Sequence, residues 1–480
     1  PKFQGGFIWD FVDQGLHGKD AEGRAIYTYG GDYNNYDPSD NNFNCNGLVS
    51  PDRVPNPHMY ETGYEYQNIW TVPVDVTKGL LRIRNEYFFR DLDNYRMEWA
   101  LLCDGKVVKS GQVEQISCGP QGTTNVTLPI GNCEGTGEYL LNVDYKLKTA
   151  EPLMEAGQTV AFQQMMVKAG TCAQETTIGK VPSLKVKDSK RDSLLTMTND
   201  AVFVQFNKRT GFLVGYTVNG QPLLGEGGTL RPNFWRAVTD NDMGGDFHKK
   251  NLVWKKPTLT LTTFEVEKVK KPQSYVQVTA GYDMPEVKAH LTLTYQIDGN
   301  GTIKVIEQLI TDKDSKQPDM ARFGMVMRQP YDMDRSEYYG RGPVENYSDR
   351  KLSQRIGIYS QTADEQFYPY IRLQETGLKS DVRWWNQTTA QGKGVRIETE
   401  EPFFASALHY AIEDLDEPGP KKAQRHSPQV PKSKYTNLCI DGAHTGVGGS
   451  NSWSDWGMAL SKYRVPCQNR TFTFCLIPVK

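Results

Sequence analysis

The chain has 480 residues, of which 23% are charged, and a formal net charge of −2 at pH 7. A charge balance of this kind gives no electrostatic reason to expect nucleic acid or an anionic membrane as a partner. No apolar run approaches the roughly 20 residues that a membrane helix needs, and the length allows several domains with separate cores.

The cysteines leave the compartment of the protein open. They are scattered and form no Cys-x-x-Cys pair, which argues against a zinc site. Cytoplasmic and periplasmic locations therefore both stay open. Aromatic residues reach 11%, a bias typical of β-rich and sugar-binding proteins. The eight cysteines are Cys45, Cys103, Cys118, Cys133, Cys172, Cys439, Cys467 and Cys475.

The chain opens with the stretch GGFIWDFVDQGL, Gly5–Leu16. Its apolar run Phe7–Trp9 predicts a strand buried on both faces. Asp10, Asp13 and Gln14 cluster where this strand should end, and active sites of parallel α/β barrels lie at the carboxyl ends of the strands. An indole beside acid and amide groups suits a sugar; the competing interpretation is a core strand with a buried Trp. Because the chain has neither a start methionine nor a signal sequence, we expect it to begin within a longer protein.

Residues 28–57 are rich in Gly, Asn, Asp and Pro, a composition that forms turns rather than helices. A loop of this length in a compact chain is usually functional or covers another part of the molecule. Disorder is the competing interpretation, but Tyr29, Tyr33, Tyr36 and Phe43 give the loop apolar surface to bury.

From about Tyr66 the hydrophobic period changes to two, as expected of strands with one buried face. Leu81 and Ile83 alternate with charged residues, and Asp104-Gly105 has the composition of a hairpin turn. Several such strands within about a hundred residues predict an antiparallel, immunoglobulin-like sandwich. We interpret it as a spacer. Further alternating sets are Tyr95, Met97, Trp99 and Leu101, and Tyr139, Leu141, Val143, Tyr145 and Leu147.

A second β region follows a change in composition. Between Lys168 and Arg191 the apolar period fades and Lys, Ser, Thr and Pro dominate, which indicates a linker. Beyond it, alternating runs are separated by turn sequences such as Asn219-Gly220 and 298–301. About 290 residues without a long amphipathic helix predict one large sandwich of many strands.

Three polar and aromatic stretches interrupt this second region: FWRAVTDNDMGG (Phe234–Gly245), YGRGPVENYSDR (Tyr339–Arg350) and DGAHTGVGGSNSWSDW (Asp441–Trp456). Each could be a structural turn in which Asp and Asn satisfy backbone groups. The third is least like an ordinary turn, because its glycines give a flexible approach to Trp453, as in a ligand-stacking platform. The competing interpretation places Trp453 in the core of the sandwich.

Taken with the opening stretch and the loop at 28–57, these motifs resemble the carboxyl-terminal part of a glycoside hydrolase family 2 β-galactosidase of the long bacterial type. The resemblance spans essentially the whole chain, in the family's order and spacing. It implies a mainly β fold: the end of a (β/α)₈ barrel in residues 1–60, an immunoglobulin-like sandwich in 61–168, a linker in 169–191, and a large, galactose mutarotase-like supersandwich in 192–480.

The family's chemistry is retaining hydrolysis of β-D-galactosides, which needs two carboxylates about 5–5.5 Å apart. In the family both are glutamates on earlier barrel strands, so we expect the chain alone to be inactive and its partner to be the barrel portion of the same enzyme. Asp10 and Asp13 are poor substitutes, because an offset of three on a strand places them on opposite faces. Asp240 and Asp242 lie in a Gly-rich turn, where backbone capping is the expected role.

The resemblance also implies the binding residues. Trp9 matches the floor of the galactose pocket, Asn46 a substrate contact, and Trp453 a platform for the leaving sugar. Phe43 and Asn46 match positions where a backbone carbonyl and a side-chain amide bind Na⁺, and oxygen ligands suit a hard cation. Asn44 and Cys45 between them depart from the pattern without changing that geometry. The resemblance further requires an aspartate from other sequence for Na⁺, and places Mg²⁺ only in the catalytic part.

The rival class is a stand-alone carbohydrate-binding or aldose-epimerase-like protein, because aldose epimerases use a similar supersandwich. Such an enzyme needs a histidine and a carboxylate that converge to move a proton. The candidates are His290, His409, His426 and His444, of which His444 in the Gly-rich loop is the least implausible. The physiological galactoside and the oligomeric state, including a homo-oligomer, stay open.

Overall fold

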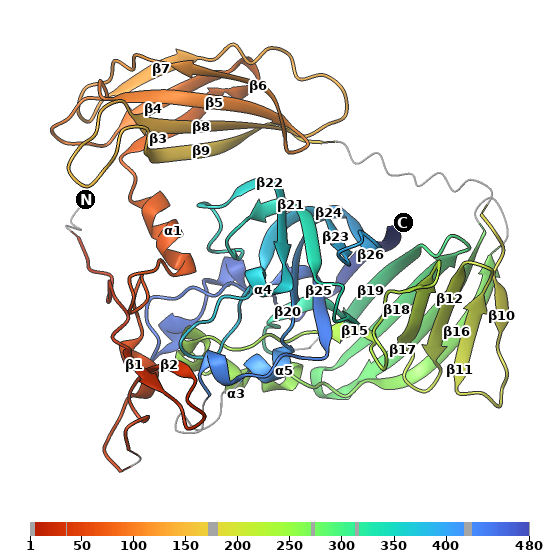
Figure 1. The fold of residues 1–480 in the computed structure, drawn as a ribbon. Helices are drawn as coiled ribbons and strands as arrows, with labels where there is room; N and C mark the ends of the chain where they lie inside the picture. Colours follow the sequence, from red (N-terminus) through yellow and green to blue (C-terminus); the bar gives the residue numbers. More distant parts are fainter. Residues whose placement is uncertain are drawn as a thin grey trace. The chain divides into compact units, whose positions relative to one another are not determined.

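The computed structural model describes residues 5–34, 36–170, 181–269, 274–312, 316–416 and 425–479. It divides into two compact units, one made of residues 1–57, 178–351 and 359–480 and the other of 58–177 and 352–358. Figure 1 shows the strands of both units. Residues 171–180 of the predicted linker, which include Cys172, lie outside the described residues, and the predicted domain limits at 60, 168 and 191 stay predictions.

The smaller unit is a two-layer antiparallel sandwich, as the alternating pattern predicts. One sheet has the order β3-β4-β7 and the other β6-β5-β8-β9. Between β5 and β6, Asp104 and Gly105 take positive φ values of 48° and 80°, the conformation that a two-residue hairpin needs. The elements are α1 (Pro57–Glu65), β3 (Ile69–Asp75), η2 (Val76–Lys78), β4 (Leu80–Asn85), β5 (Tyr95–Cys103), β6 (Lys106–Val113), β7 (Thr123–Thr127), β8 (Tyr139–Leu147) and β9 (Thr159–Lys168).

The core of this sandwich consists of the residues that the period of two selects. Ile83, Tyr95, Trp99 and Tyr145 are buried in one cluster, and their neighbours in sequence are more exposed. The predicted immunoglobulin-like sandwich is therefore confirmed.

The larger unit is built on one 17-stranded sheet. The sheet curls back on itself, because Phe206 of β12 packs against Tyr295 of β18 with ring centroids 4.9 Å apart, and a single hydrophobic core joins early and late strands. The predicted large sandwich is confirmed. Its strands are β10 (Lys185–Lys187), β11 (Leu194–Thr198), β12 (Val202–Asn207), β13 (Leu213–Val218), β14 (Gln221–Pro222), β15 (Leu230–Asn233), β16 (Thr260–Val269), β17 (Tyr275–Met284), β18 (Ala289–Asp298), β19 (Ile303–Thr311), β20 (Arg322–Pro330), β21 (Arg335–Gly342), β22 (Arg355–Thr362), β23 (Lys379–Thr388), β24 (Gly394–Leu408), β25 (Tyr435–His444) and β26 (Arg470–Val479).

Helices in this unit are short and lie in the connections between strands. Among the described residues of the chain, no helix is long and apolar enough to cross a membrane. The helical elements are α2 (Asp240–Gly244), α3 (Phe247–Lys250), η3 (Leu252–Trp254), η4 (Pro285–Val287), α4 (Ala363–Gln366), α5 (Ile412–Leu415), η6 (Ser427–Gln429), η7 (Asp455–Gly457) and η8 (Ser461–Tyr463).

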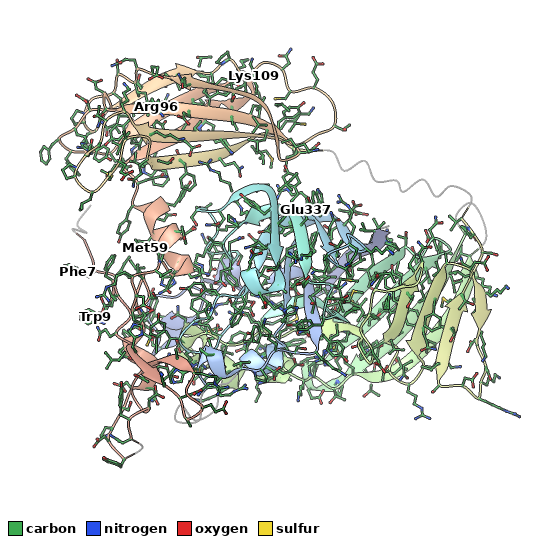
Figure 2. All side chains as sticks on the ribbon, viewed as in Figure 1. Phe7, Trp9, Met59, Arg96, Lys109 and Glu337 are labelled. Carbon is green, nitrogen blue, oxygen red and sulfur yellow. The ribbon has the colours of Figure 1, made fainter. Side chains whose placement is uncertain are left out.

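The first residues of the chain differ from the prediction. Residues 5–9 form no strand. Phe7 and Trp9, both labelled in Figure 2, are 101% and 75% exposed. Among the described residues, backbone hydrogen bonds to this segment begin at Asp10, so the apolar run has neither a neighbouring strand nor a covering layer. The predicted buried strand, with or without a core Trp, is wrong. The segment instead continues into the hairpin β1 (Leu16–Lys19) and β2 (Ala25–Thr28) and the turn η1 (Asn41–Asn44).

Candidate functional site

The opening stretch and the FNCNGL motif (43–48) form one piece of backbone. Asp10 N donates to Asn46 O at 3.0 Å, and Leu48 N donates to Asp10 O at 3.0 Å. Val12 and Val49 form a parallel bridge. The two segments approach so closely that a Cβ at Gly47 would lie 2.0 Å from Asp13 N, which requires glycine there. Two motifs that are separate in sequence are therefore joined by backbone hydrogen bonds.

Asp10 and Asp13 have opposite environments. Asp13 is buried and accepts hydrogen bonds from Gly47 N at 2.7 Å and Asn56 Nδ2 at 3.1 Å; burial raises the pKa of this carboxyl despite those bonds. Asp10 accepts from Gln14 Nε2 at 2.6 Å, and this bond holds the pKa of its carboxyl below the usual range. The strand geometry expected for the pair does not apply, because these residues are not in a strand. The Asp13 carboxylate nevertheless binds Gly47 N and Asn56 Nδ2, which is a structural role. We therefore do not assign Asp13 as a replacement for a catalytic glutamate.

Phe43 and Asn46 meet through the two groups predicted to bind Na⁺. Asn46 Nδ2 donates to the carbonyl oxygen of Phe43. Rotation of the amide by half a turn exchanges its nitrogen for its oxygen, which would place two oxygens side by side, the ligand type that a hard cation prefers. The structure thus places the two predicted ligand groups next to each other, and Na⁺ binding by them stays a prediction. Among the described residues, no three His, Cys, Asp or Glu side chains are grouped to hold a metal.

Trp453 lies against Phe43. Their ring centroids are 5.7 Å apart with an interplanar angle of 59°. Trp453 is 67% exposed and Phe43 is 39% exposed, so both rings present surface to solvent. The interpretation of Trp453 as a core residue is wrong. Trp9 precedes Asp10, whose N donates to Asn46 O, but among the described residues no ring contact joins Trp9 to Phe43 or Trp453.

Helix α2, in the first polar and aromatic stretch, connects the Phe43 segment with the Trp453 loop. Asn42 Nδ2 donates to Asp240 Oδ2 at 2.9 Å. At the other end of the helix, a Cβ at Gly244 would lie 2.2 Å from the carbonyl carbon of Ser452. The contact between Asn42 and Asp240 was not predicted, because the sequence holds no signal for a pair so far apart.

Asp242 caps α2, as predicted, although the segment is a helix and not a turn. Asp242 and Thr239 form a capping box. The Asp242 carboxylate also accepts from Arg236 Nη2 at 3.1 Å, and Arg236 Nη2 donates to Gly446 O at 3.0 Å. Arg236 is fully buried. This buried pair therefore holds Gly446, within the third polar and aromatic stretch, a role that sequence reasoning missed.

The four histidines of the rival class do not form an open site. His290 is exposed and lies 2.7 Å from Asp283 Oδ1. His444 Nε2 lies 3.8 Å from Glu375 Oε1, but both side chains are buried. His444 Nδ1 is hydrogen bonded to Thr445 O at 2.8 Å. His409 and His426 are also buried, beside Asp364 and Asp32 respectively.

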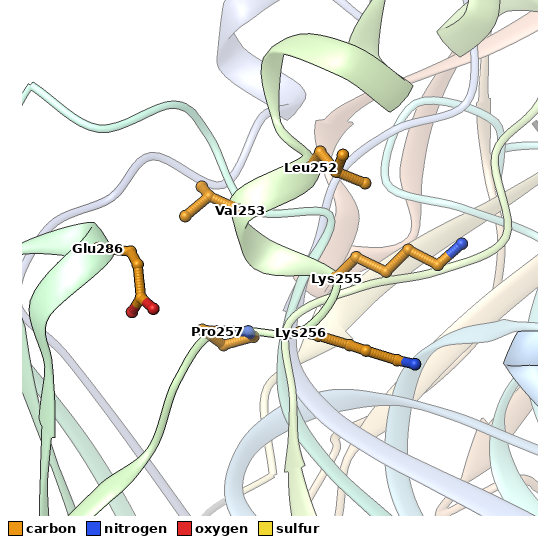
Figure 3. A pocket seen from close by; sticks show the side chains of 6 residues that line it. All are labelled: Leu252, Val253, Lys255, Lys256, Pro257 and Glu286. Atoms are coloured by element: carbon orange, nitrogen blue, oxygen red, sulfur yellow. The ribbon is translucent and has the colours of Figure 1, made fainter.

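A cavity of about 330 Å³ lies elsewhere in the larger unit, beside η3. Figure 3 shows that the ammonium groups of Lys255 and Lys256 point away from Glu286. Lys255 Nζ instead pairs with Asp416 at 2.5 Å. Because its charged groups do not converge, this cavity offers no catalytic arrangement.

Exposed aromatic rings beside amide and carboxylate groups on a β-sandwich are typical of a carbohydrate-binding protein. Three family models match consecutive parts of the chain: the TIM barrel domain of glycosyl hydrolases family 2 over residues 1–71, domain 4 of beta-galactosidase over 81–168, and the beta-galactosidase small chain over 198–476. The chain belongs to the beta-galactosidase small chain family, within glycoside hydrolase family 2. The resemblance in the sequence is thereby confirmed.

Curated relatives are similar along nearly the whole chain. A beta-galactosidase of Priestia megaterium is 32% identical over 94% of this chain and 43% of its own length. A beta-galactosidase of Halalkalibacterium halodurans is 30% identical over 94% of this chain and 43% of its own length. The chain thus spans less than half the length of these relatives. Among solved structures, galactose 1-epimerase from Lactobacillus acidophilus aligns with 61% of this chain and 98% of its own, at 10% identity and a TM-score of 0.30.

Proposed function

We propose that the chain forms the aromatic and amide part of the substrate site of a retaining β-galactosidase that hydrolyses terminal β-D-galactosides. The observation that carries the proposal is the contact between Phe43 and Trp453, two partly exposed rings from distant parts of the chain. Solvent-exposed aromatic faces cover the C–H surfaces of a sugar, while neighbouring amide groups bind its hydroxyls.

In this proposal each predicted residue has a separate task. Trp9 forms the floor of the galactose pocket, Asn46 binds the galactose, and Trp453 stacks on the leaving sugar or aglycone. Phe43 O and Asn46 Oδ1 would hold Na⁺ beside the sugar and so keep the local backbone in place. The names of the relatives and the order of the family matches support a β-galactosidase as the longer protein, whereas the tasks of single residues rest on the resemblance of their motifs.

The two catalytic glutamates, and Mg²⁺ with them, belong in this proposal to the barrel portion of a longer protein. That portion is the chain's expected partner, and a homo-oligomer stays open. Purified residues 1–480 are expected to leave a chromogenic β-galactoside intact and the mutarotation of galactose unaccelerated. Mutarotation above the buffer rate would favour the epimerase class instead.

The role of Trp453 is tested in the full-length enzyme. Trp453→Ala is expected to raise KM for a β-galactosyl disaccharide by about threefold to tenfold, because an aromatic contact is worth on the order of 1 kcal/mol. The value of kcat should change little, since stacking at the pocket mouth acts on the ground state. The melting temperature should stay unchanged, because Trp453 is largely exposed.

Trp456→Ala is the matched control. Trp456 is 72% exposed in the same loop, and no ring contact to Phe43 is found for it among the described residues. This variant should keep the wild-type KM. An unchanged KM in Trp453→Ala, or an equal rise in both variants, would contradict the role given to Trp453.

A further inference from the structure

The loop that carries Trp453 is closed by its own hydrogen bonds. Ser450 N donates to Trp456 O at 2.7 Å, which joins the two ends of the loop. Inside it, Asn451 Oδ1 accepts from Trp453 N at 3.2 Å and from Ser454 N at 3.1 Å. The residues just before the loop, 446–449, are one attachment that sets its orientation, and the close approach of Gly244 to Ser452 is another.

Asp349, in the second polar and aromatic stretch, holds those residues. Its Oδ1 accepts from Val447 N at 3.1 Å and its Oδ2 accepts from Gly448 N at 2.8 Å. Consecutive backbone amides around one carboxylate form an anion-binding nest, and such charge-assisted bonds are stronger than neutral ones. A Cβ at Gly446 would lie 2.3 Å from Asp349 Oδ2. The glycine at 446 thus permits a close approach to the carboxylate, in addition to the flexibility that the sequence suggested.

Asp349 is itself fixed in place. It lies in the two-residue turn between Tyr347 and Arg350, whose backbones exchange hydrogen bonds of 2.9 and 3.0 Å. Tyr347 is buried, and Arg350 Nη2 pairs with Glu345 Oε1 at 2.6 Å. The carboxylate is therefore presented to the loop from a rigid part of the sandwich, a support of the kind that a preorganised site needs.

We infer that Asp349 is a positioning residue, which orients Trp453 toward the substrate by clamping the amides of Val447 and Gly448. This inference rests on the proposed function, because it assumes that Trp453 contacts the leaving group. It gives the second polar and aromatic stretch a part in substrate selection, which its sequence does not predict. Asp349 acts only through the loop, so its effect must depend on the indole that the loop presents.

The test is a double-mutant cycle in the full-length enzyme, with KM and kcat measured on a β-galactosyl disaccharide. Asp349→Ala is expected to raise KM by about threefold to tenfold, up to the effect of Trp453→Ala, with kcat changed less than about twofold. In the Trp453→Ala background, Asp349→Ala should add less than about twofold to KM, since residues that act as a unit are not additive. Asp349→Asn, which keeps one acceptor oxygen, should fall between wild type and Asp349→Ala.

Asp455→Asn is the matched control, because it removes a carboxylate from the Trp453 loop that pairs with exposed Lys250 at 2.7 Å. Surface pairs of this kind contribute little, and KM should stay at the wild-type value. Equal effects of Asp349→Ala with and without Trp453, or no rise in KM, would overturn the inference while leaving the proposed function intact. If Trp453→Ala itself leaves KM unchanged, the proposed function fails, and the positioning role fails with it. Should Asp349→Ala not fold, the same criteria apply to Asp349→Asn.

Discussion

Phe43 and Trp453, near opposite ends of the chain, lie with their ring centroids 5.7 Å apart. The two rings are held by different contacts. The Phe43 segment is held by the hydrogen bond from Asn42 to Asp240. The Trp453 loop is held by its internal hydrogen bonds and by the bonds from the amides before it to Asp349. The aromatic surface is therefore a product of the tertiary fold. Under the proposed function, variants at the two ends of the chain should therefore affect the same substrate site.

Trp9→Ala should damage the full-length enzyme more than Trp453→Ala. In the proposed site Trp9 touches the galactose that reaches the transition state, so its loss should lower kcat/KM on every galactoside, whatever the leaving group. Trp453 should matter only where the leaving group is large enough to stack. Steady-state kinetics on a disaccharide and on an aryl galactoside measure both effects. If Trp9→Ala changes KM for the disaccharide alone, the two tryptophans have been assigned to the wrong sugars.

Asn46→Ala should weaken the response of the full-length enzyme to sodium. Removal of one oxygen ligand is expected to raise the Na⁺ concentration for half-maximal activity by about tenfold, as the loss of one strong polar contact does. Asn44→Ala is the control, since Asn44 Nδ2 contacts only the backbone oxygen of Gln14, at 3.3 Å, in this part of the structure. Activity is titrated with NaCl at constant ionic strength. An identical sodium response in both variants would remove Asn46 from the ligand set.

Amide exchange in purified residues 1–480 should be fast at Gly5–Trp9 and slow in the central strands of the large sheet. Residues 5–9 lack backbone partners among the described residues, whereas β18 pairs along its length with β17 and β19. Exchange follows local opening, which is easiest where few groups are buried or bonded. Hydrogen exchange measured by mass spectrometry compares these peptides directly. Protection at 5–9 equal to that of β18 in a monomer would show that another part of the chain covers the segment.

Local features of the fold could be predicted from the sequence, whereas contacts between distant segments could not. The turn at Asp104-Gly105 and the alternating strands around it depend on local chemistry, namely positive φ and a period of two, and the structure has both. The run Phe7–Trp9 was predicted as a buried strand because apolar residues favour burial; burial, however, needs neighbours, and the sequence of a segment does not specify them. Asn42 and Asp240 are 198 residues apart in the sequence, and no local pattern predicts their contact.

Of the site residues, Trp453 was selected correctly as a residue outside the core, because a Gly-rich polar loop seldom buries an indole. The contact of Trp453 with Phe43 was not predicted. Their roles toward substrate and sodium stay predictions. Asp349 was not predicted as a site residue. The local sequence around an aspartate in a turn is the same whether its carboxylate caps its own backbone or binds the backbone of a distant loop.

Asp441, at the start of the third polar and aromatic stretch, should make the stability of the large sandwich depend on pH. Its carboxyl is fully buried on β25, and burial raises its pKa to about 7 although Arg322 Nε lies 3.6 Å away. The folded state therefore keeps the proton up to about pH 7, whereas an unfolded chain releases it near pH 4. Between these values the unfolded state binds fewer protons, so the free energy of unfolding falls as pH rises, by up to about 1.4 kcal/mol per pH unit, and levels off above pH 7.

Asp441→Asn removes this titration while keeping the shape and the neutral charge that the side chain has at low pH. The variant should match the wild type near pH 4.5 and become the more stable of the two as pH rises to 7.5. Urea unfolding of both proteins at the two pH values, followed by a probe of the large sandwich, measures the difference. Because all other titrating groups are shared, the change in that difference between the two pH values reports on Asp441. A difference that is the same at both pH values would mean that the Asp441 carboxyl is already ionised in the folded protein, held in that state by Arg322.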